Sequence, residues 1–232
     1  MELIIEGLKK KYDEKEVLKG INFTFKKGKI YGLLGRNGSG KTTLFNCLNE
    51  DISIDAGKFF IRDEEEIREV ESSDIGYVLS TPVVPEFLTA REFLNFFISI
   101  NKNKIKNLKN TDEYFDLMHI EAFDRDIIMK DYSHGMKNKM QMLINIIASP
   151  NIILLDEPLT SLDIVVADEM KKLFKTIKKD HILIFSTHIL ELAVDLCDEI
   201  VILNNGVLEL IAKEELNNKQ FEDKIVSSLR GE

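Results

Sequence analysis

The chain lacks a long hydrophobic run. Its longest uncharged stretch, Met140–Leu155, is interrupted by Asn145, Pro150 and Asn151, whereas a helix that spans a bilayer needs about 20 mostly apolar residues. We therefore expect no transmembrane helix, and any role at a membrane requires a partner that spans it. Because Met1 leads directly into a strand-like segment, we also expect no targeting peptide.

Positive charge is outnumbered by negative charge, and cysteine is scarce. Lys and Arg total 31 against 40 Asp and Glu, and the formal net charge is -9. This acidic balance disfavours a general nucleic-acid-binding surface. The two cysteines, Cys47 and Cys197, are far apart in the sequence, which is typical of a chain in a reducing compartment. We find no internal repeat and no low-complexity linker, and the length suits one sizeable domain or two unequal lobes.

The motif with the most specific chemistry is a glycine-rich loop, GRNGSGKTT, which fits the phosphate-binding pattern G-x-x-x-x-G-K-[ST]. An apolar, β-prone segment precedes it and a helix-compatible segment follows, so a chance match in a turn is the weaker interpretation. Backbone N–H groups of residues 38–43 are expected to point at the phosphates. Lys41 would neutralise the β- and γ-phosphates, and the Thr42 hydroxyl would ligate Mg²⁺. We expect the whole loop to bind ATP: Gly35, Arg36, Asn37, Gly38, Ser39, Gly40, Lys41, Thr42 and Thr43.

Two later strands are predicted to end in catalytic side chains. Residues 151–155 have the continuous apolar pattern of a buried parallel strand, and two carboxylates follow it. Asp156 can hold the Mg²⁺ shell, and Glu157 can accept a proton from the attacking water. A second buried strand over 182–187 leads to His188, whose imidazole could donate to the γ-phosphate. Two solvated acids would be the simpler interpretation of the pair, but the upstream phosphate loop favours catalysis.

The remaining pattern changes from β-like to helical after Ser80. Residues 2–6 and 16–34 predict an antiparallel β layer that leads into the phosphate-loop strand, and residues 88–149 are largely helical. The other expected elements are strands at 58–62 and 74–79, a solvated helix or loop over the acidic run 63–71, a lysine-rich loop at Lys102, Lys104, Lys106 and Lys109, a hairpin around 204–206, and a terminal helix with a frayed end over 212–232.

Tyr12 and a set of apolar residues in the helical region each have two interpretations. Tyr12 is either a half-exposed turn residue or a flat surface for an adenine base. Phe93, Phe96, Phe97 and Ile100 recur at helical spacing, as in an amphipathic helix of a core or in a groove that binds a partner's helix. The residues alone favour the simpler interpretation in both cases.

In this order, the motifs resemble those of the ATP-binding-cassette (ABC) family, the ATP-binding subunits of ABC transporters, over nearly the whole chain. Tyr12 matches the aromatic residue that stacks on adenine. Residues 35–43 match the first nucleotide motif, residues 152–157 the second, and His188 the switch histidine. The resemblance implies an ATPase that uses ATP and Mg²⁺ and reverses the simpler interpretation of Tyr12.

The segment from Tyr132 to Met136 stands where the family has its signature, usually Leu-Ser-Gly-Gly-Gln. It opens an expected helix over 134–148 that Ser133 can cap. The resemblance implies a head-to-tail dimer in which the signature meets the γ-phosphate held by the partner subunit. The residues assigned to this contact are Ser133, His134, Gly135 and Met136, with Asp163 from the loop Ser161-Leu162-Asp163.

Two positions depart from the family pattern. Ser80 stands where the family has a glutamine, and a shorter serine hydroxyl could still reach Mg²⁺ or water. His134 and Met136 replace Gly and Gln in the signature. The form Tyr-Ser-His-Gly-Met-Lys resembles that of bacterial export-type ATPases, including drug and antimicrobial-peptide resistance systems.

The fold implied is an α/β P-loop cassette with a mixed central sheet, an N-terminal antiparallel β layer and a helical lobe. The core lobe would contain residues 1–84 and 151–232, and the helical lobe residues 85–150. The implied partners are a second copy or a paralogous subunit and an integral membrane permease, which would hold the chain at the cytoplasmic face of the cell membrane. The permease would dock near 80–97, where at least one aromatic should be exposed among Phe87, Phe93, Phe96 and Phe97.

Two other functions compete with this one. A mechanical ABC ATPase acting on DNA or ribosomes usually has a long coiled-coil insertion or two cassettes in one chain, and 232 residues fit neither. A nucleotide-binding regulator without turnover is suggested by Ser80, but Glu157 and His188 favour hydrolysis.

Overall fold

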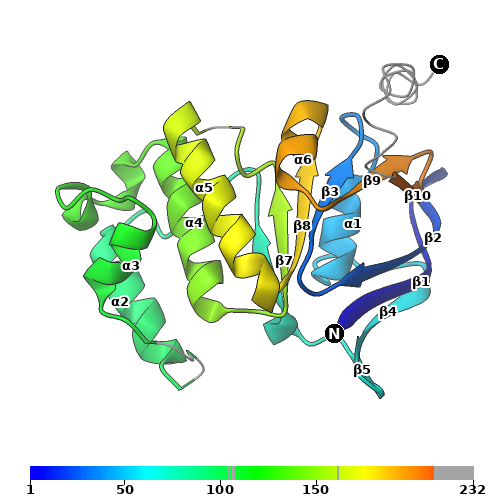
Figure 1. Cartoon of the computed structure of the whole chain (residues 1–232), viewed down its shortest axis with the longest axis horizontal. Helices are drawn as coiled ribbons and strands as arrows, with labels where there is room; N and C mark the ends of the chain where they lie inside the picture. The colour runs from blue at the N-terminus through cyan, green and yellow to red at the C-terminus, as the bar shows by residue number, and fades with distance from the viewer. Residues whose placement is uncertain (104, 106–107, 161, 212–232) are drawn as a thin grey trace.

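The computed structural model describes residues 1–103, 105, 108–160 and 162–211. Within them, the first sheet is antiparallel, with the strand order β2-β1-β4-β5. Its strands are β1 (Glu2–Tyr12), β2 (Lys15–Lys26), β4 (Ala56–Asp63) and β5 (Glu66–Glu69). The predicted N-terminal antiparallel layer is confirmed, and it forms one side of the molecule in Figure 1.

The second sheet is mixed and has the order β10-β9-β3-β8-β7-β6. Its strands are β3 (Ile30–Leu34), β6 (Ile75–Val78), β7 (Ile152–Asp156), β8 (Ile182–Thr187), β9 (Glu199–Asn204) and β10 (Val207–Ile211). The β9–β10 pair is antiparallel, as the hairpin signal at 204–206 predicts, and the other neighbours are parallel. All carboxyl ends of β3, β7 and β8 therefore meet at one edge, the upper edge in Figure 1.

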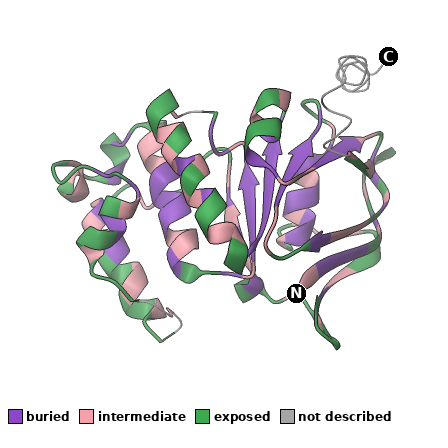
Figure 2. Cartoon of the chain, viewed as in Figure 1, coloured by how far each residue is buried: buried purple, intermediate pink, exposed green. Residues whose placement is uncertain are grey.

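The central strands are buried because helices or the other sheet cover both faces (Figure 2). Every residue of β3, β7 and β8 is buried. Helix α1 (Lys41–Leu48) packs between the two sheets, where Leu44 and Phe45 join a core with Leu3 and Tyr31. On the opposite face of the central sheet lies a second hydrophobic core, which includes Leu143 of α4 and Phe174 of α5. Continuous apolar strands are the pattern expected of such a doubly covered parallel sheet.

The helices begin where the sequence provides caps. Thr89 caps α2 (Ala90–Asn101) and Asn110 caps α3 (Thr111–Leu117), each with a glutamate that completes a capping box. Ser133 caps α4 (His134–Ala148), whose predicted bounds are confirmed. The other helices are α5 (Ile164–Ile177), α6 (Leu190–Leu196) and the short 3-10 helices η1 (Ser72–Asp74), η2 (Asp124–Asp126), η3 (Met129–Asp131) and η4 (Lys178–Asp180).

One local prediction is wrong. The acidic run 63–71 was expected as a solvated helix or loop, but Glu66–Glu69 forms strand β5 against β4. The reason is a hairpin: Glu64 takes a left-handed conformation with φ 54° that turns the chain back onto β4, whose edge is free to pair with it. Charged residues are common on such edge strands because they discourage further pairing.

Some predictions concern residues outside the described ranges. These are the terminal helix at 212–232, Ser161, and Lys104 and Lys106 of the lysine-rich loop. Among the described residues, no helix is long and apolar enough to cross a membrane. Residues 90–148, as far as they are described, contain helices and turns but no strand.

Candidate functional site

A cavity of about 480 Å³ lies at the carboxyl ends of β3, β7 and β8. It brings together the phosphate loop, the two acids after β7 and the histidine after β8, which are far apart in the sequence. Ligand sites of open α/β sheets lie at this edge. The residues lining the cavity are Val17, Asn37, Gly38, Gly40, Lys41, Thr42, Thr43, Ser80, Asp156, Glu157, Thr160 and His188.

The phosphate loop ends in an uncapped helix terminus. Gly40 is the N-cap of α1 and has φ 109°, a conformation that strongly favours glycine, and no side chain caps the helix. The backbone N–H groups of the first turn, from Lys41 to Thr43, have no acceptor within an α-helix. Since these residues line the cavity, the positive end of the helix dipole is available to an anion there.

Lys41 is held beneath the loop. Its Nζ donates to the carbonyl oxygens of Gly35 at 2.6 Å and Arg36 at 3.3 Å, and the residue is buried. Burial lowers the pKa of Lys41, and the charges of Glu157 and Asp156 oppose this effect. The hydrogen-bond acceptors of the ammonium group are therefore two neutral carbonyl oxygens, and Glu157 and Asp156 lie near it. A bound phosphate would give the ammonium group a negatively charged partner.

Thr42 and Asp156 face each other across the floor of the cavity. The Thr42 hydroxyl donates to Asp156 Oδ2 at 2.9 Å, and the Ser186 hydroxyl donates to Asp156 Oδ1 at 2.5 Å. Hydroxyl and carboxylate oxygens form a hard donor set that suits Mg²⁺, and Mg²⁺ usually takes one or two protein ligands together with phosphate oxygens. The residues present therefore fit the metal, with Ser80 lining the same cavity.

Glu157 is positioned by contacts on both its backbone and its side chain. It has φ 51°, a left-handed conformation that is uncommon for a non-glycine residue. Its N–H donates to Ser186 Oγ at 3.1 Å, and the Thr160 hydroxyl donates to its carbonyl oxygen at 2.9 Å. The Nδ1 atom of His188 lies 2.9 Å from Glu157 Oε1. Contacts from two segments, the end of β8 and the loop after β7, therefore hold Glu157 at the cavity that it lines.

Two residues of this arrangement were not anticipated from the sequence. Ser186 links Asp156 to the N–H of Glu157, and Thr160 supports Glu157 from the loop that follows. A hydroxyl two residues before His188, in a strand that is apolar up to Phe185, was the available signal. Its meaning depends on the register, because β8 places Ser186 directly beside Asp156.

Some predicted ATP-binding residues lie outside the cavity lining. Tyr12 is the last residue of β1, is 46% exposed and has the Lys10 ammonium 5.5 Å from its ring centroid. Arg36 and Ser39 line a neighbouring hollow of about 160 Å³, and Gly35 lies under the loop, where its carbonyl receives Lys41. The roles of these side chains stay predictions.

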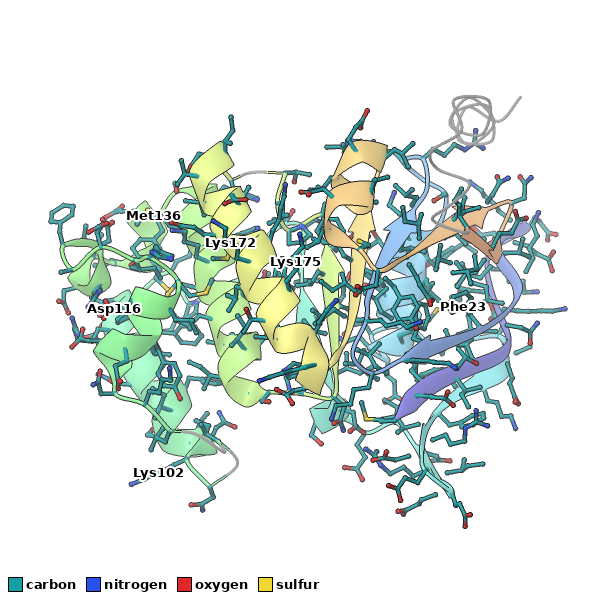
Figure 3. The ribbon with its side chains drawn as sticks, viewed as in Figure 1. Phe23, Lys102, Asp116, Met136, Lys172 and Lys175 are labelled. Atoms are coloured by element: carbon teal, nitrogen blue, oxygen red, sulfur yellow. The ribbon has the colours of Figure 1, made fainter. Side chains whose placement is uncertain are left out.

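The signature-like residues are also outside the cavity of this chain. Ser133 accepts a hydrogen bond from the N–H of Met136, and Figure 3 shows Met136 in the helical part of the molecule. Asp163 caps α5 by accepting from the N–H groups of Val165 and Val166, each at 3.1 Å. A role of this segment at an ATP site therefore requires a site on another subunit.

Taken together, the loop, the buried lysine and the paired acids define a P-loop nucleoside triphosphatase. The model of the family described as ABC transporter matches residues 18–160, which is more than half of the chain. The chain belongs to this family and is an ATP-binding ATPase of the ABC type.

Similar proteins agree with this assignment. This chain is similar to YxlF and YcbN of Bacillus subtilis (strain 168), both of which are named uncharacterized ABC transporter ATP-binding proteins. YxlF is 32% identical over 88% of this chain and 68% of its own length. YcbN is 29% identical over 93% of this chain and 71% of its own length.

Solved structures share the fold. An ATP-binding subunit of an ABC transporter superposes with a TM-score of 0.82 at 22% identity, over 99% of this chain and 100% of the other. A cassette described as a dimer in a post-hydrolysis state with ADP and Pi gives 0.75 at 20% identity, over 91% and 98%. The predicted cassette fold is confirmed.

Proposed function

We propose that this chain hydrolyses ATP as one subunit of an ABC transporter and drives a separate membrane permease. The observation that carries the proposal is the convergence of Lys41, Thr42, Asp156, Glu157 and His188 on one cavity. Three strands far apart in sequence deliver these side chains, so their meeting depends on the whole sheet.

Each residue then has a separate task. Lys41 and the N-terminus of α1 bind the phosphates, and Thr42 and Asp156 would hold Mg²⁺, which would supply positive charge to the phosphoryl group. Glu157 accepts a proton from the attacking water. His188 orients the Glu157 carboxylate and lies beside the position where the γ-phosphate would end. Tyr12, outside the cavity lining, would stack on the adenine base.

A second subunit would complete the site. The N-terminus of α4, at the exposed Ser133 and His134, does not line the cavity of its own chain. This placement supports a contact with a nucleotide held by a partner. The similar cassette described as a dimer with ADP and Pi supports the same arrangement. Two copies, or this chain and a paralogous one, would close on ATP and separate after hydrolysis.

The permease would contact exposed aromatic residues at the start of the helical lobe, for which we keep the bounds 85–150. Phe87 is 80% exposed and Phe96 57% exposed, whereas Phe93 and Phe97 pack partly against the core. The expectation of at least one exposed aromatic here is confirmed. Such a contact would place the chain at the cytoplasmic face of the cell membrane. Export rather than import stays a prediction from the form of the signature.

The test is an ATPase assay on the purified chain, followed by isolation of the tagged chain from membranes. We expect Mg²⁺-dependent turnover and co-purification with an integral membrane protein. Turnover without a membrane partner would favour a mechanical ABC ATPase. ATP binding without turnover would favour a nucleotide-binding regulator. The observation that suggests a regulator is Ser80, which lines the cavity at the position where the family has a glutamine.

A further inference from the structure

Asn138 is buried on the helix that begins at the signature-like segment. It lies in the second turn of α4, and only 1% of its surface is exposed. Its Nδ2 group donates a hydrogen bond of 2.8 Å to the carbonyl oxygen of Pro158. Pro158 directly follows the acid Glu157, so this bond joins the signature end of α4 to the catalytic segment.

The position of Glu157 depends on such bonds. Its left-handed backbone, with φ 51°, persists only where surrounding contacts fix it. Ser186 holds its N–H from β8, Thr160 holds its carbonyl group, and Asn138 holds the next carbonyl group along the chain. Of these three contacts, the one from Asn138 comes from the helical region.

Stability alone does not account for an asparagine at this place. Its Oδ1 atom is buried and has no hydrogen-bond partner among the described residues. A buried amide with an unpaired oxygen carries a desolvation penalty that an apolar side chain of similar size avoids. What the amide provides is a directed donor to Pro158, which an apolar side chain cannot replace.

We propose that Asn138 is a positioning residue that aligns Glu157 according to the state of the signature end of its own subunit. This inference rests on the proposed function, in which that end of α4 contacts the nucleotide held by the partner subunit. A displacement of α4 on that contact is passed through Asn138 to the Pro158 carbonyl and so to Glu157. Each subunit thereby aligns its own acid when it engages the nucleotide of the other, which couples the two ATP sites.

The test compares Asn138→Leu with Gln141→Leu. Gln141 is a buried amide on the same helix whose Oε1 also has no partner among the described residues, and the hydrogen bond to the Pro158 carbonyl comes from Asn138 instead. For Asn138→Leu we expect kcat to fall about tenfold, the size of effect of one lost buried hydrogen bond. The Hill coefficient for ATP should fall toward about 1. The Kd of the isolated subunit for a fluorescent ATP analogue should stay within about twofold, because the phosphate loop is unchanged.

The control and the rescue variant separate positioning from general packing. Gln141→Leu should keep kcat and the Hill coefficient, and Asn138→Gln, which retains a donor, should recover part of the lost kcat. Equal losses in Gln141→Leu and Asn138→Leu would overturn the positioning role. Should Asn138→Leu fail to fold by circular dichroism, Asn138→Ala carries the same expectations.

The possible failures are distinguishable. If the unmodified chain neither hydrolyses ATP nor dimerises with it, the proposed function itself is wrong. If it does both and Asn138→Leu retains the kcat and Hill coefficient of the unmodified chain, only the coupling role is overturned.

Discussion

The imidazole of His188 lies against the carboxylate of Glu157, with Nδ1 2.9 Å from Oε1 and 2.8 Å from Oε2. A ring nitrogen that carries a proton donates to this carboxylate and fixes its direction. The histidine was expected from the sequence to reach the γ-phosphate. Its contact with Glu157 adds an orienting task, because a proton acceptor must be within hydrogen-bond reach of the water it activates.

Glu157→Gln tests the proton acceptor. The amide keeps the shape of the carboxylate but cannot accept the proton from water, so turnover should fall about a hundredfold or more. ATP affinity should be unchanged, and an ATP-bound dimer should accumulate on size-exclusion chromatography. Glu191→Gln, which changes an exposed acid on α6, is the matched control. Parent-like hydrolysis by Glu157→Gln would show that another group accepts the proton.

Lys41→Ala tests the phosphate loop. The ammonium group is buried beneath the loop, and its loss removes the charge partner of the phosphates. The Kd for ATP, measured by titration calorimetry, should rise about tenfold or more. Lys27→Ala, at an exposed turn outside the site, should leave the Kd unchanged. An unaltered ATP affinity in Lys41→Ala would count against the assigned role.

Ser186→Ala tests the support of the metal ligand. Without the hydroxyl, Asp156 Oδ1 loses its 2.5 Å hydrogen bond and the carboxylate is no longer held in one orientation. Affinity for Mn²⁺ in the presence of ATP, measured by electron paramagnetic resonance, should fall about tenfold. Thr187→Val removes the adjacent hydroxyl, which instead accepts from the N–H of Ile189, and should leave Mn²⁺ affinity unchanged. Equal Mn²⁺ affinity in Ser186→Ala and the parent would contradict the prediction.

Phe96→Asp tests the permease contact. Because 57% of Phe96 is exposed, the charge should leave folding and ATP binding intact. It should abolish co-purification with the membrane protein, because a charge at the centre of an apolar contact is left unpaired. Phe123→Asp changes another exposed aromatic outside the predicted contact and should co-purify normally. Retained assembly of Phe96→Asp would place the contact elsewhere.

Asp74→Asn tests a polar cluster that joins β5 to the central sheet. Asp74 accepts from Arg68 at 2.5 and 2.7 Å and from Asn151 at 2.6 Å. Burial alone would raise the pKa of Asp74, but these bonds outweigh burial and hold the pKa below its usual value. The variant should lose roughly 2 kcal/mol of unfolding free energy at neutral pH, as for hydrogen bonds to a charged group.

The pH dependence of that loss has a defined sign. A carboxyl whose folded-state pKa is lowered contributes stability above about pH 4, and this contribution is lost as the pH falls through the native pKa. Urea denaturation curves of parent and Asp74→Asn should therefore converge at low pH. Glu69→Gln, an exposed neighbour on β5, should change stability by less than about 0.5 kcal/mol. A constant difference between parent and Asp74→Asn at all pH values would exclude the ionic explanation.

The sequence by itself determined the parts of the site that are local. Lys41, Thr42 and the glycines of the loop lie in one turn and at the start of one helix. Their spacing in the sequence therefore predicts how they are arranged around a phosphate. The same holds for Ser133, whose cap on α4 is formed within three residues. Continuous apolar segments likewise predicted the central strands, because burial on both faces leaves no alternation.

Tertiary structure alone decided what lies beside what. The contact between Asp156 and Ser186 follows from the register of β7 and β8, and a shift of one residue would turn Ser186 to the other face. The acidic segment 66–69 became a strand because β4 provided a partner edge, against its local composition. Asn138 reaches Pro158 only because α4 packs against β6, the strand next to β7. Hydrogen bonds between distant segments depend on chain packing, which local residue patterns do not encode.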